Sequence, residues 1–232
     1  QPVLGSYPIT PASTILEALA GYKNHGMITV QAEDEIAAIC AAIGASFAGS
    51  LGMTSTSGPG MALKGEAMGL AISSELPLVI VDIQRAGPST GMPTKVEQSD
   101  LLQSIFGRNG DAPMPVLACS RPSDAFELAI EACRIAVQYM TPVILLSDNF
   151  IANGAEPWRL PDLSKLQPFP VEFATSPEGH ATFGRDANGS RPWVKPGTKG
   201  MEFRIGGLEK DGKGNVSYDP DNHQGMTDQR HA

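Results

Sequence analysis

The sequence has few cysteines, and their spacing matches no metal site. Its 232 residues include three cysteines, with no CxxC pair and no Cys/His spacing that could hold zinc or an iron-sulfur cluster. We therefore expect no metal on this chain. The same scarcity predicts that Cys40, Cys119 and Cys133 are buried thiols in a reducing compartment.

Clustered positive charge and long apolar runs are also missing. The 17 Lys and Arg residues are scattered and the formal net charge is −8, which argues against a nucleic-acid partner. Residues 36–53 carry no charge but are rich in Ala, Gly and Ser, so they do not predict a membrane span. No signal-peptide pattern opens the sequence, and the expected location is cytoplasmic.

The length fits one large domain, or one domain with an appendage. The first residues, QPVLGSYPITP, read as the end of a strand, so the chain is expected to be part of a longer polypeptide. After Asn149 the helical and strand periodicity disappears, and Pro, Gly and Asp recur. We expect a first domain over residues 1–155 and an extended arm or linker over 156–232.

Apolar strand-like runs alternate with helical patterns in the first part of the chain. This alternation predicts an α/β fold, with an open, mostly parallel sheet and helices on both faces. The expected strands are 27–31, 51–55, 77–83, 115–119 and 142–147. The expected helices are 11–22, 33–48, 60–73, 97–106 and 123–139, with Thr10 as a possible cap of the first.

Ligands of such sheets bind where strands end and helices begin. The turn TSTSGPG (54–60) could present backbone amides to an anion, but it has neither Walker nor GxGxxG spacing, and a structural turn is at least as good an interpretation. Arg85 directly follows a predicted buried strand. Its planar guanidinium suits a carboxylate ligand. The alternative is an ion pair with Asp82 or Glu97.

Three acidic residues, Glu33, Asp34 and Glu35, open the helix expected at 33–48. Carboxylates in a first turn favour the helix dipole by about 0.3–1 kcal/mol each, and this alone could explain all three. However, no charge follows until Lys64, so we expect this helix to be buried on all sides. Glu35 would then be partly desolvated and able to exchange a proton with a ligand, while Glu33 and Asp34 remain solvated.

Several long motifs resemble one family. They are YPITPAST, QAEDEIAAICAAIGASFAG, TSTSGPG, QRAGPSTGMPTKVEQSDLLQSIFGRNGDAP and YMTPVILLSDNFIANGAEPW. Together they resemble the alpha subunit of 2-oxoacid:ferredoxin oxidoreductases, most of all the 2-oxoglutarate type. The likeness covers almost the whole chain. It implies the pyrimidine-binding domain of a thiamine diphosphate enzyme, which is one half of a split active site.

The resemblance assigns roles to individual residues. Glu35 would hydrogen-bond a nitrogen of the cofactor's aminopyrimidine and promote loss of the thiazolium proton, and its spacing to Gly44 favours it over Glu33. Thr10 and Arg85 would bind the substrate carboxylate. The remaining residues expected to bind the cofactor are Tyr7, Pro8, Ile9, Thr56, Ser57 and Gly58.

The implied reaction is oxidative decarboxylation of 2-oxoglutarate to succinyl-CoA, with electrons passing to ferredoxin. A GDG…N signature is missing, so the resemblance assigns magnesium, the diphosphate and an iron-sulfur cluster to a separate beta subunit. A heterodimer or a dimer of heterodimers would be the active form, and this chain alone would be inactive. The alternatives are pyruvate or a branched-chain 2-oxoacid as substrate, or a non-catalytic assembly module on the same fold.

The chain departs from the family pattern at both ends. A gamma-like domain often precedes YPITP in the family, and a transketolase C-terminal-like region should follow the tail. Neither is found in this sequence. We therefore expect the chain by itself to be inactive.

Overall fold

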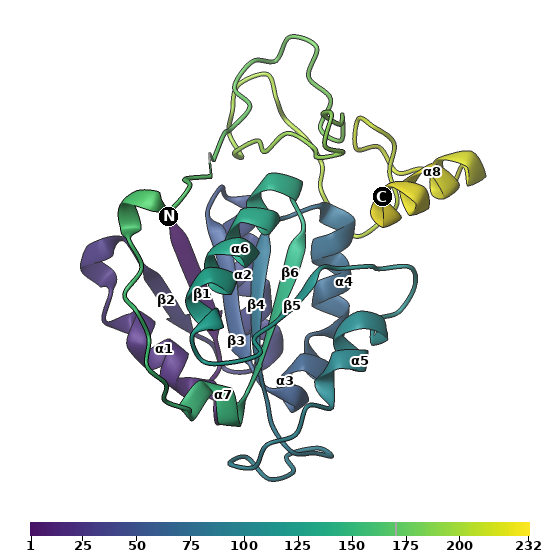
Figure 1. Cartoon of the computed structure of the whole chain (residues 1–232). Helices are drawn as coiled ribbons and strands as arrows, with labels where there is room; N and C mark the ends of the chain where they lie inside the picture. Colours follow the sequence, from purple (N-terminus) through teal and green to yellow (C-terminus); the bar gives the residue numbers. More distant parts are fainter. Residues whose placement is uncertain (170) are drawn as a thin grey trace.

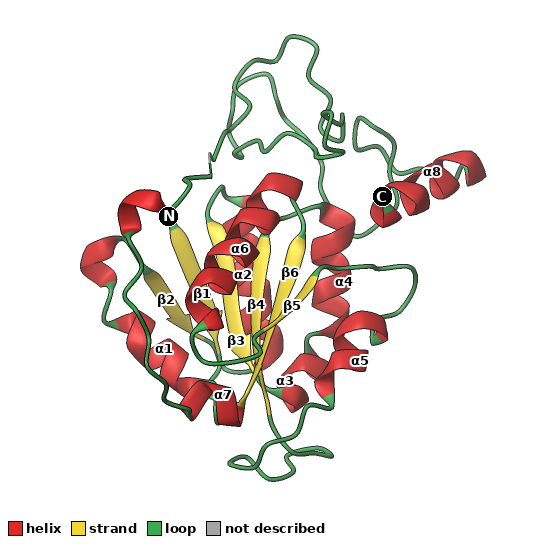
Figure 2. Cartoon of the chain, viewed as in Figure 1, coloured by secondary structure: helices red, strands yellow, loops and turns green. Residues whose placement is uncertain are grey.

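The computed structural model describes residues 1–169 and 171–232. Six parallel strands form one sheet in the order β2-β1-β3-β4-β6-β5, which confirms the predicted α/β class (Figures 1 and 2). The strands are β1 Pro2–Ser6, β2 Ile28–Gln31, β3 Leu51–Thr56, β4 Leu78–Gln84, β5 Val116–Ala118 and β6 Pro142–Asp148. The five predicted strands agree with β2 to β6 within one residue at each end. β1 is a five-residue strand that the sequence indicated only as a strand end.

Helices cover both faces of the sheet. Ile39, Met61 and Met68, from α2, α3 and α4, pack on one face. Leu16 of α1 and Ala132 of α6 pack on the other. The helices are α1 Ser13–Ala20, α2 Glu35–Phe47, α3 Gly58–Leu63, α4 Gly65–Ser74, α5 Asp100–Phe106, α6 Asp124–Tyr139, α7 Asn149–Asn153 and α8 Pro220–His231, with 3₁₀ turns at Lys23–His25 and Leu163–Lys165. Among the described residues, no helix combines the length and apolar character needed to cross a membrane.

Two predicted helix details are wrong. The helix expected at 60–73 is two helices, because the chain breaks at Lys64, whose side chain turns into the protein and has no exposed surface. Thr10 does not cap α1. Ala12 occupies the N-cap position, since the amides of Ala12 and Ser13 first bond the carbonyl of Ile9 in a separate turn.

The helix α2 is not buried on all sides as the sequence predicted. Glu35 and Ile39 are buried with the rest of its inner face, but Ile36 is 50% exposed and Cys40 also faces outward. The prediction of three buried thiols is therefore wrong for Cys40. The outer face of α2 lacks charge without being covered in this chain.

The later part of the tail packs against the amino-terminal edge of the sheet (Figure 1), whereas residues 154–158 lie beside the start of α6. Trp193 is 5% exposed and its Nε1 donates to the Ser46 carbonyl oxygen at 3.1 Å. Arg185 forms an ion pair with Glu75, which ends α4. This tail thus contributes buried side chains to the molecule, although the division at residue 155 stays a prediction.

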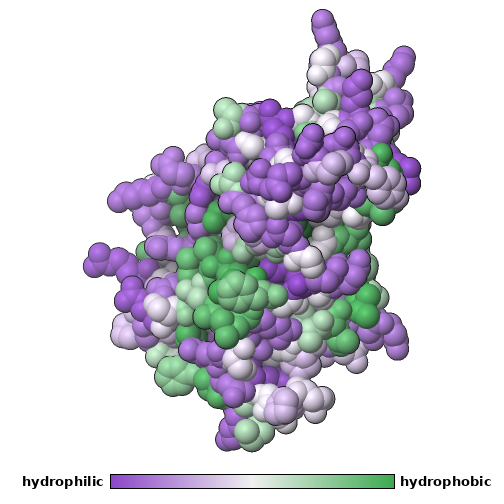
Figure 3. All heavy atoms as spheres, turned by 90° about the vertical axis from the view of Figure 1, so that its right-hand side faces the viewer, coloured by the Kyte–Doolittle hydropathy of each residue, from purple (hydrophilic) through white to green (hydrophobic). Residues whose placement is uncertain are grey.

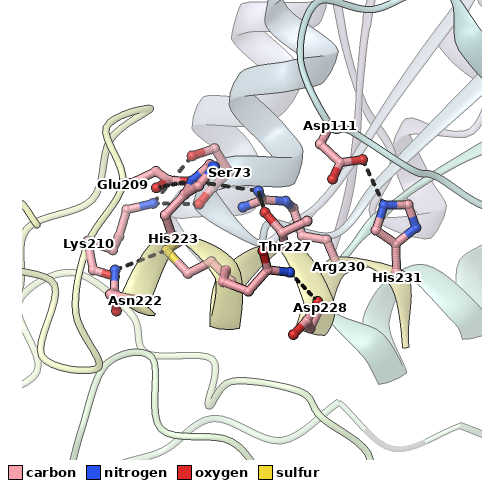
Figure 4. A network of polar contacts seen from close by, with 12 residues as sticks. Ser73, Asp111, Glu209, Lys210, Asn222, His223, Thr227, Asp228, Arg230 and His231 are labelled. Atoms are coloured by element: carbon pink, nitrogen blue, oxygen red, sulfur yellow. Dashed lines mark hydrogen bonds and ion pairs between the residues drawn. The ribbon is translucent and has the colours of Figure 1, made fainter. Parts of the chain in front are cut away.

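The helix α8 was not expected from the sequence. The side chain of Asp219 accepts bonds from the amides of Asp221 and Asn222, and Pro220 occupies the first turn, where its missing N–H costs nothing. Polar contacts hold α8 and the residues that precede it, from Glu209 onward, to the body of the protein (Figure 4). They include Lys210 to the Ser73 carbonyl at 2.6 Å and His231 to Asp111 at 2.7 Å.

Apolar side chains gather on the face of the molecule that carries α4 and α5 (Figure 3). Leu102 and Phe106 of α5 are 66% and 75% exposed, and Leu63 at the end of α3 is 52% exposed. Exposed apolar patches of this kind are typical of contact surfaces.

Candidate functional site

The candidate site lies at the carboxyl ends of the strands, the edge opposite the tail (Figure 1). From β1 the chain crosses to β2 on one side, and from β2 it returns through α2 to β3 on the other. The sheet therefore has a topological switch point between β1 and β3, where open parallel sheets bind ligands. A contact of 2.9 Å between Ser6 Oγ and Ser55 Oγ joins these two strands near the site.

Glu35 begins the helix that crosses at this switch point. It is 8% exposed, whereas Glu33 and Asp34 are exposed, so the predicted difference between the three acids is confirmed. Asp34 is the N-cap of α2, because its Oδ1 accepts from the Ala37 amide at 2.8 Å. Helix capping thus explains Asp34 but not the buried position of Glu35.

The side chain of Glu35 occupies space that a glycine leaves open. A Cβ atom at Gly60 would stand 2.9 Å from Glu35 Cγ and 2.0 Å from Thr56 Oγ1. Any larger residue at position 60 would displace one of these two groups. Within residues 1–169 and 171–232, no hydrogen bond to either carboxyl oxygen of Glu35 is formed.

Lys64 contacts the backbone of Glu35. Its Nζ donates to the Glu35 backbone carbonyl oxygen at 3.1 Å. Burial lowers the pKa of this ammonium group to about 8, against the opposing charges of Glu35, Asp34 and Asp82. The sequence analysis used Lys64 only as the end of an uncharged run. A lysine within an otherwise apolar stretch was the one signal in the sequence that could have predicted a buried, functional Lys64.

Asp82 and Asp100 form a buried pair of acidic residues. Burial, and then the charge of Asp100, raise the pKa of Asp82 well above its ordinary value. Burial also raises the pKa of Asp100. These carboxyl groups thus bind a proton more readily than exposed ones. The sequence suggested Asp82 only as an ion-pair partner and did not indicate Asp100.

Arg85 is 6% exposed and follows β4 directly. Its Nη1 donates to the Thr10 backbone oxygen at 2.7 Å, which brings together the two residues predicted to bind a carboxylate. Within the described part of the chain, Arg85 forms no ion pair with Asp82 or Glu97, and its buried Nε has no partner. The Glu97 carboxylate accepts from the Gly87 amide instead.

The other predicted cofactor residues divide into two groups. Thr56 and Ser57 are buried at the end of β3, and the Ser57 hydroxyl has no partner among the described residues. The side chains of Tyr7 and Pro8 are exposed at the same edge, with Ile9 half-buried. Within the described part of the chain, no hydrogen bond joins any of these three side chains to Glu35.

The turn around Gly58 does not favour the anion interpretation. The carboxyl oxygens of Asp100 stand 2.8 and 2.9 Å from the place that a Cβ at Gly58 would take. An incoming anion would therefore meet a carboxyl group. Because α3 is only six residues long and Ser57 makes no capping bond, the structural-turn interpretation is favoured.

Comparison with known proteins identifies the family. A sequence model for the family described as pyruvate flavodoxin/ferredoxin oxidoreductase, thiamine diphosphate-binding, matches residues 2–213. The chain belongs to this family.

Individual relatives agree with that membership. The chain is 57% identical over 232 residues to 2-oxoglutarate oxidoreductase subunit KorA of Mycobacterium tuberculosis, covering 99% of this chain and 36% of the relative. It is 46% identical over 164 residues to 2-oxoglutarate synthase subunit KorA of Archaeoglobus fulgidus, covering 70% of this chain and 47% of the relative. The chain thus spans less than half the length of these relatives.

A solved structure of the same kind is closely similar. It is 2-oxoglutarate:ferredoxin oxidoreductase from Magnetococcus marinus with 2-oxoglutarate, coenzyme A and succinyl-CoA bound. The TM-score is 0.89 at 38% identity, covering 99% of this chain and 40% of that chain.

The residues at the switch point fit the cofactor of this thiamine diphosphate-binding family. A buried carboxyl group without a partner suits hydrogen bonding to a ring nitrogen, and Glu35 supplies one. The unpaired Ser57 hydroxyl and Arg85 Nε add polar atoms at the same edge of the sheet. Two cavities of about 780 and 660 Å³ lie elsewhere, between the core and the tail, and are lined by Arg185 and Trp193 respectively.

Proposed function

We propose that this chain forms the pyrimidine-binding half of the thiamine diphosphate site of a 2-oxoacid:ferredoxin oxidoreductase. The observation that carries the proposal is Glu35, a residue 8% exposed at the switch point of the sheet, whose carboxyl oxygens accept no hydrogen bond within the described residues. The proposed reaction of the complete enzyme is oxidative decarboxylation of 2-oxoglutarate to succinyl-CoA, with electrons transferred to ferredoxin. The names of the related proteins support 2-oxoglutarate over other 2-oxoacids.

Glu35 holds or donates a proton at its carboxyl group toward the aminopyrimidine nitrogen. Bound thiamine diphosphate supplies the carbon nucleophile for attack on the 2-oxo group. Gly60 leaves room for the Glu35 side chain, because a Cβ atom at position 60 would stand 2.9 Å from Glu35 Cγ. Tyr7, Pro8, Ile9, Ser57 and Gly58 complete the proposed cofactor contacts.

Arg85 and Thr10 bind the carboxylate of the 2-oxoacid. The bond from Arg85 Nη1 to the Thr10 backbone oxygen orients the guanidinium plane and leaves its Nε free of protein partners within the described residues. An oriented guanidinium suits a carboxylate because it can donate two parallel hydrogen bonds.

A separate beta subunit completes the site. Among the described residues, no group of three or more His, Cys, Asp or Glu side chains is arranged to hold a metal ion. We place magnesium and an iron-sulfur cluster on that subunit because of the resemblance to the family. The beta subunit would also hold the diphosphate, and coenzyme A and ferredoxin would act on the assembled enzyme. We propose a heterodimer or dimer of heterodimers in the cytoplasm.

The test is activity of the full-length polypeptide assembled with its beta subunit. We expect 2-oxoglutarate and coenzyme A to drive ferredoxin reduction faster than pyruvate or branched-chain 2-oxoacids do. Glu35→Gln keeps the shape but cannot supply the proton, so the rate should fall by roughly 10² to 10⁴. The matched control Glu33→Gln removes an exposed carboxylate and should leave the rate unchanged. Equal rates in the two variants would refute the role of Glu35.

A further inference from the structure

Glu35 is contacted by Gly60, within α3, and by Lys64, the residue that caps the end of α3. Gly60 lies against the Glu35 side chain, and Lys64, one turn later, reaches the Glu35 backbone. The Lys64 amide bonds the Gly60 carbonyl at 3.1 Å, so the two contacts are held one helical turn apart. Glu35 is therefore bounded by α3 at its side chain and by the residue that caps α3 at its carbonyl group.

Lys64 is costly to bury. A lysine ammonium group prefers water, and removing it requires compensating charges or hydrogen bonds. Lys64 has no exposed surface, and the hydrogen bond recorded for its Nζ goes to the Glu35 carbonyl oxygen. The carboxylates of Glu35 and Asp34 supply nearby negative charge. A smaller apolar residue would fill this space without that cost, so the cation needs an explanation.

The Glu35 carbonyl oxygen belongs to the first turn of α2. A bond to it from outside the helix determines where this turn lies relative to α3 and, through α3, relative to Thr56 on β3. We propose that Lys64 is a positioning residue for Glu35, holding the first turn of α2 so that the carboxyl group stays directed at the cofactor. Its meaning in catalysis rests on the function proposed above.

Lys210 offers a matched control. It too is a buried lysine, its Nζ donates to the Ser73 backbone oxygen at 2.6 Å, and burial lowers its pKa to about 8. However, it lies in the tail, at the opposite edge of the sheet (Figures 1 and 4). Lys210→Met should reproduce the general effect of removing a buried lysine and leave Glu35 undisturbed.

The first measurement uses the assembled enzyme without cofactor. Amide hydrogen exchange of peptides covering residues 31–45, followed by mass spectrometry, reports opening of the first turn of α2. Lys64→Met should accelerate exchange in these peptides, and Lys210→Met should not. Unchanged exchange in the Lys64 variant would contradict the proposal.

The second measurement is a double-mutant cycle on the assembled enzyme saturated with thiamine diphosphate. Exchange of the thiazolium proton is followed by NMR after acid quench. Lys64→Met should slow this exchange by roughly 10²-fold, as expected for a misplaced catalytic group. In the Glu35→Gln background it should add no further loss, because Lys64 acts through Glu35.

The outcomes separate the two proposals. Slow exchange in Glu35→Gln with wild-type exchange in Lys64→Met would overturn only the role of Lys64, as would equal losses from Lys64→Met in both backgrounds. Wild-type exchange in Glu35→Gln would overturn the proposed function and this inference with it. Should Lys64→Met fail to assemble, Lys64→Leu, which also lacks an N–H donor, takes its place in the same cycle under the same criteria.

Discussion

At the scale of single residues, buried charge gathers behind the proposed site. Lys64 and Asp82 have no exposed surface, and Asp100 is 6% exposed. Lys64 lies near the Glu35 side of the site, and Asp100 lies beside the Gly58 turn. Burial shifts the pKa of such groups, so the free energy of unfolding depends on the protonation of Lys64, Asp82 and Asp100.

Asp82→Asn should change how stability depends on pH. Burial and the charge of Asp100 raise the pKa of Asp82 in the folded protein above its unfolded value. The folded state therefore binds more protons, and the stability contributed by Asp82 is present below the unfolded pKa and lost as pH rises through the folded pKa. Relative to wild type, the Asn variant should gain stability as pH rises from about 4. Urea unfolding across pH 4–8 measures this difference.

A half-buried aspartate in the tail, Asp211, gives a control of opposite sign. Hydrogen bonds from Asn215, first from its side chain and then from its amide, lower the pKa of Asp211. Its stability contribution is present above the unfolded pKa and lost as pH falls, so Asp211→Asn should lose stability relative to wild type as pH rises from about 3 to 5. Parallel pH dependence in the Asp82 and Asp211 variants would contradict the assigned burial of Asp82.

At the scale of elements, the packing of α2 against α3 depends on a glycine. Gly60 lies on the face of α3 that meets Glu35 and Thr56, with no room for a side chain. Gly44, in α2, has open space around the position of its Cβ. The two glycines therefore separate the effect of close packing from the effect of helix propensity.

Gly60→Ala should destabilise the full-length polypeptide by about 1–3 kcal/mol, because the added Cβ forces neighbours apart. Gly44→Ala should instead be neutral or stabilise by up to about 1 kcal/mol, because alanine loses less backbone entropy in a helix. The midpoint of chemical unfolding measures both. Equal destabilisation by the two changes would show that Gly60 is not sterically required.

At the scale of the whole molecule, the tail and the proposed site lie at opposite edges of one sheet (Figure 1). Trp193 packs with Val137 and Met140 near the end of α6, and Arg185 reaches Glu75 at the end of α4. The part of the tail that holds Arg185 and Trp193 thus stabilises the amino-terminal edge, away from the proposed site. We expect mutations in the tail to affect stability without affecting cofactor binding.

Trp193→Phe removes the indole N–H that bonds the Ser46 carbonyl oxygen. The free energy of unfolding should fall by about 0.5–1.5 kcal/mol, the net contribution of one hydrogen bond, because the Ser46 carbonyl oxygen keeps its bond from the Gly49 amide. Amide exchange in tail peptides should accelerate, while the thiamine diphosphate dissociation constant of the assembled enzyme stays unchanged. Trp158→Phe, at a 47% exposed residue, is the control and should stay within about 0.5 kcal/mol of wild type. A changed dissociation constant for Trp193→Phe would refute the separation of the two edges.

The sequence by itself determined the fold class, the limits of five strands and the separation of Glu35 from Glu33 and Asp34. These features depend on local periodicity and on the run of uncharged residues behind Glu35, both of which can be read along the chain. The motifs that resemble the family also indicated a thiamine diphosphate-binding domain, in agreement with its membership of that family.

Only the tertiary structure decided which side chains meet. Lys64 reaches Glu35 across 29 positions, and Arg85 reaches Thr10 across 75. The break between α3 and α4, the exposure of Cys40 and the attachment of the tail likewise depend on packing against distant segments. Hydrophobic pattern specifies that a residue prefers burial, but the strand order decides which residues share the space. The proposed site therefore depends on the topological switch point between β1 and β3, which no local stretch of sequence encodes.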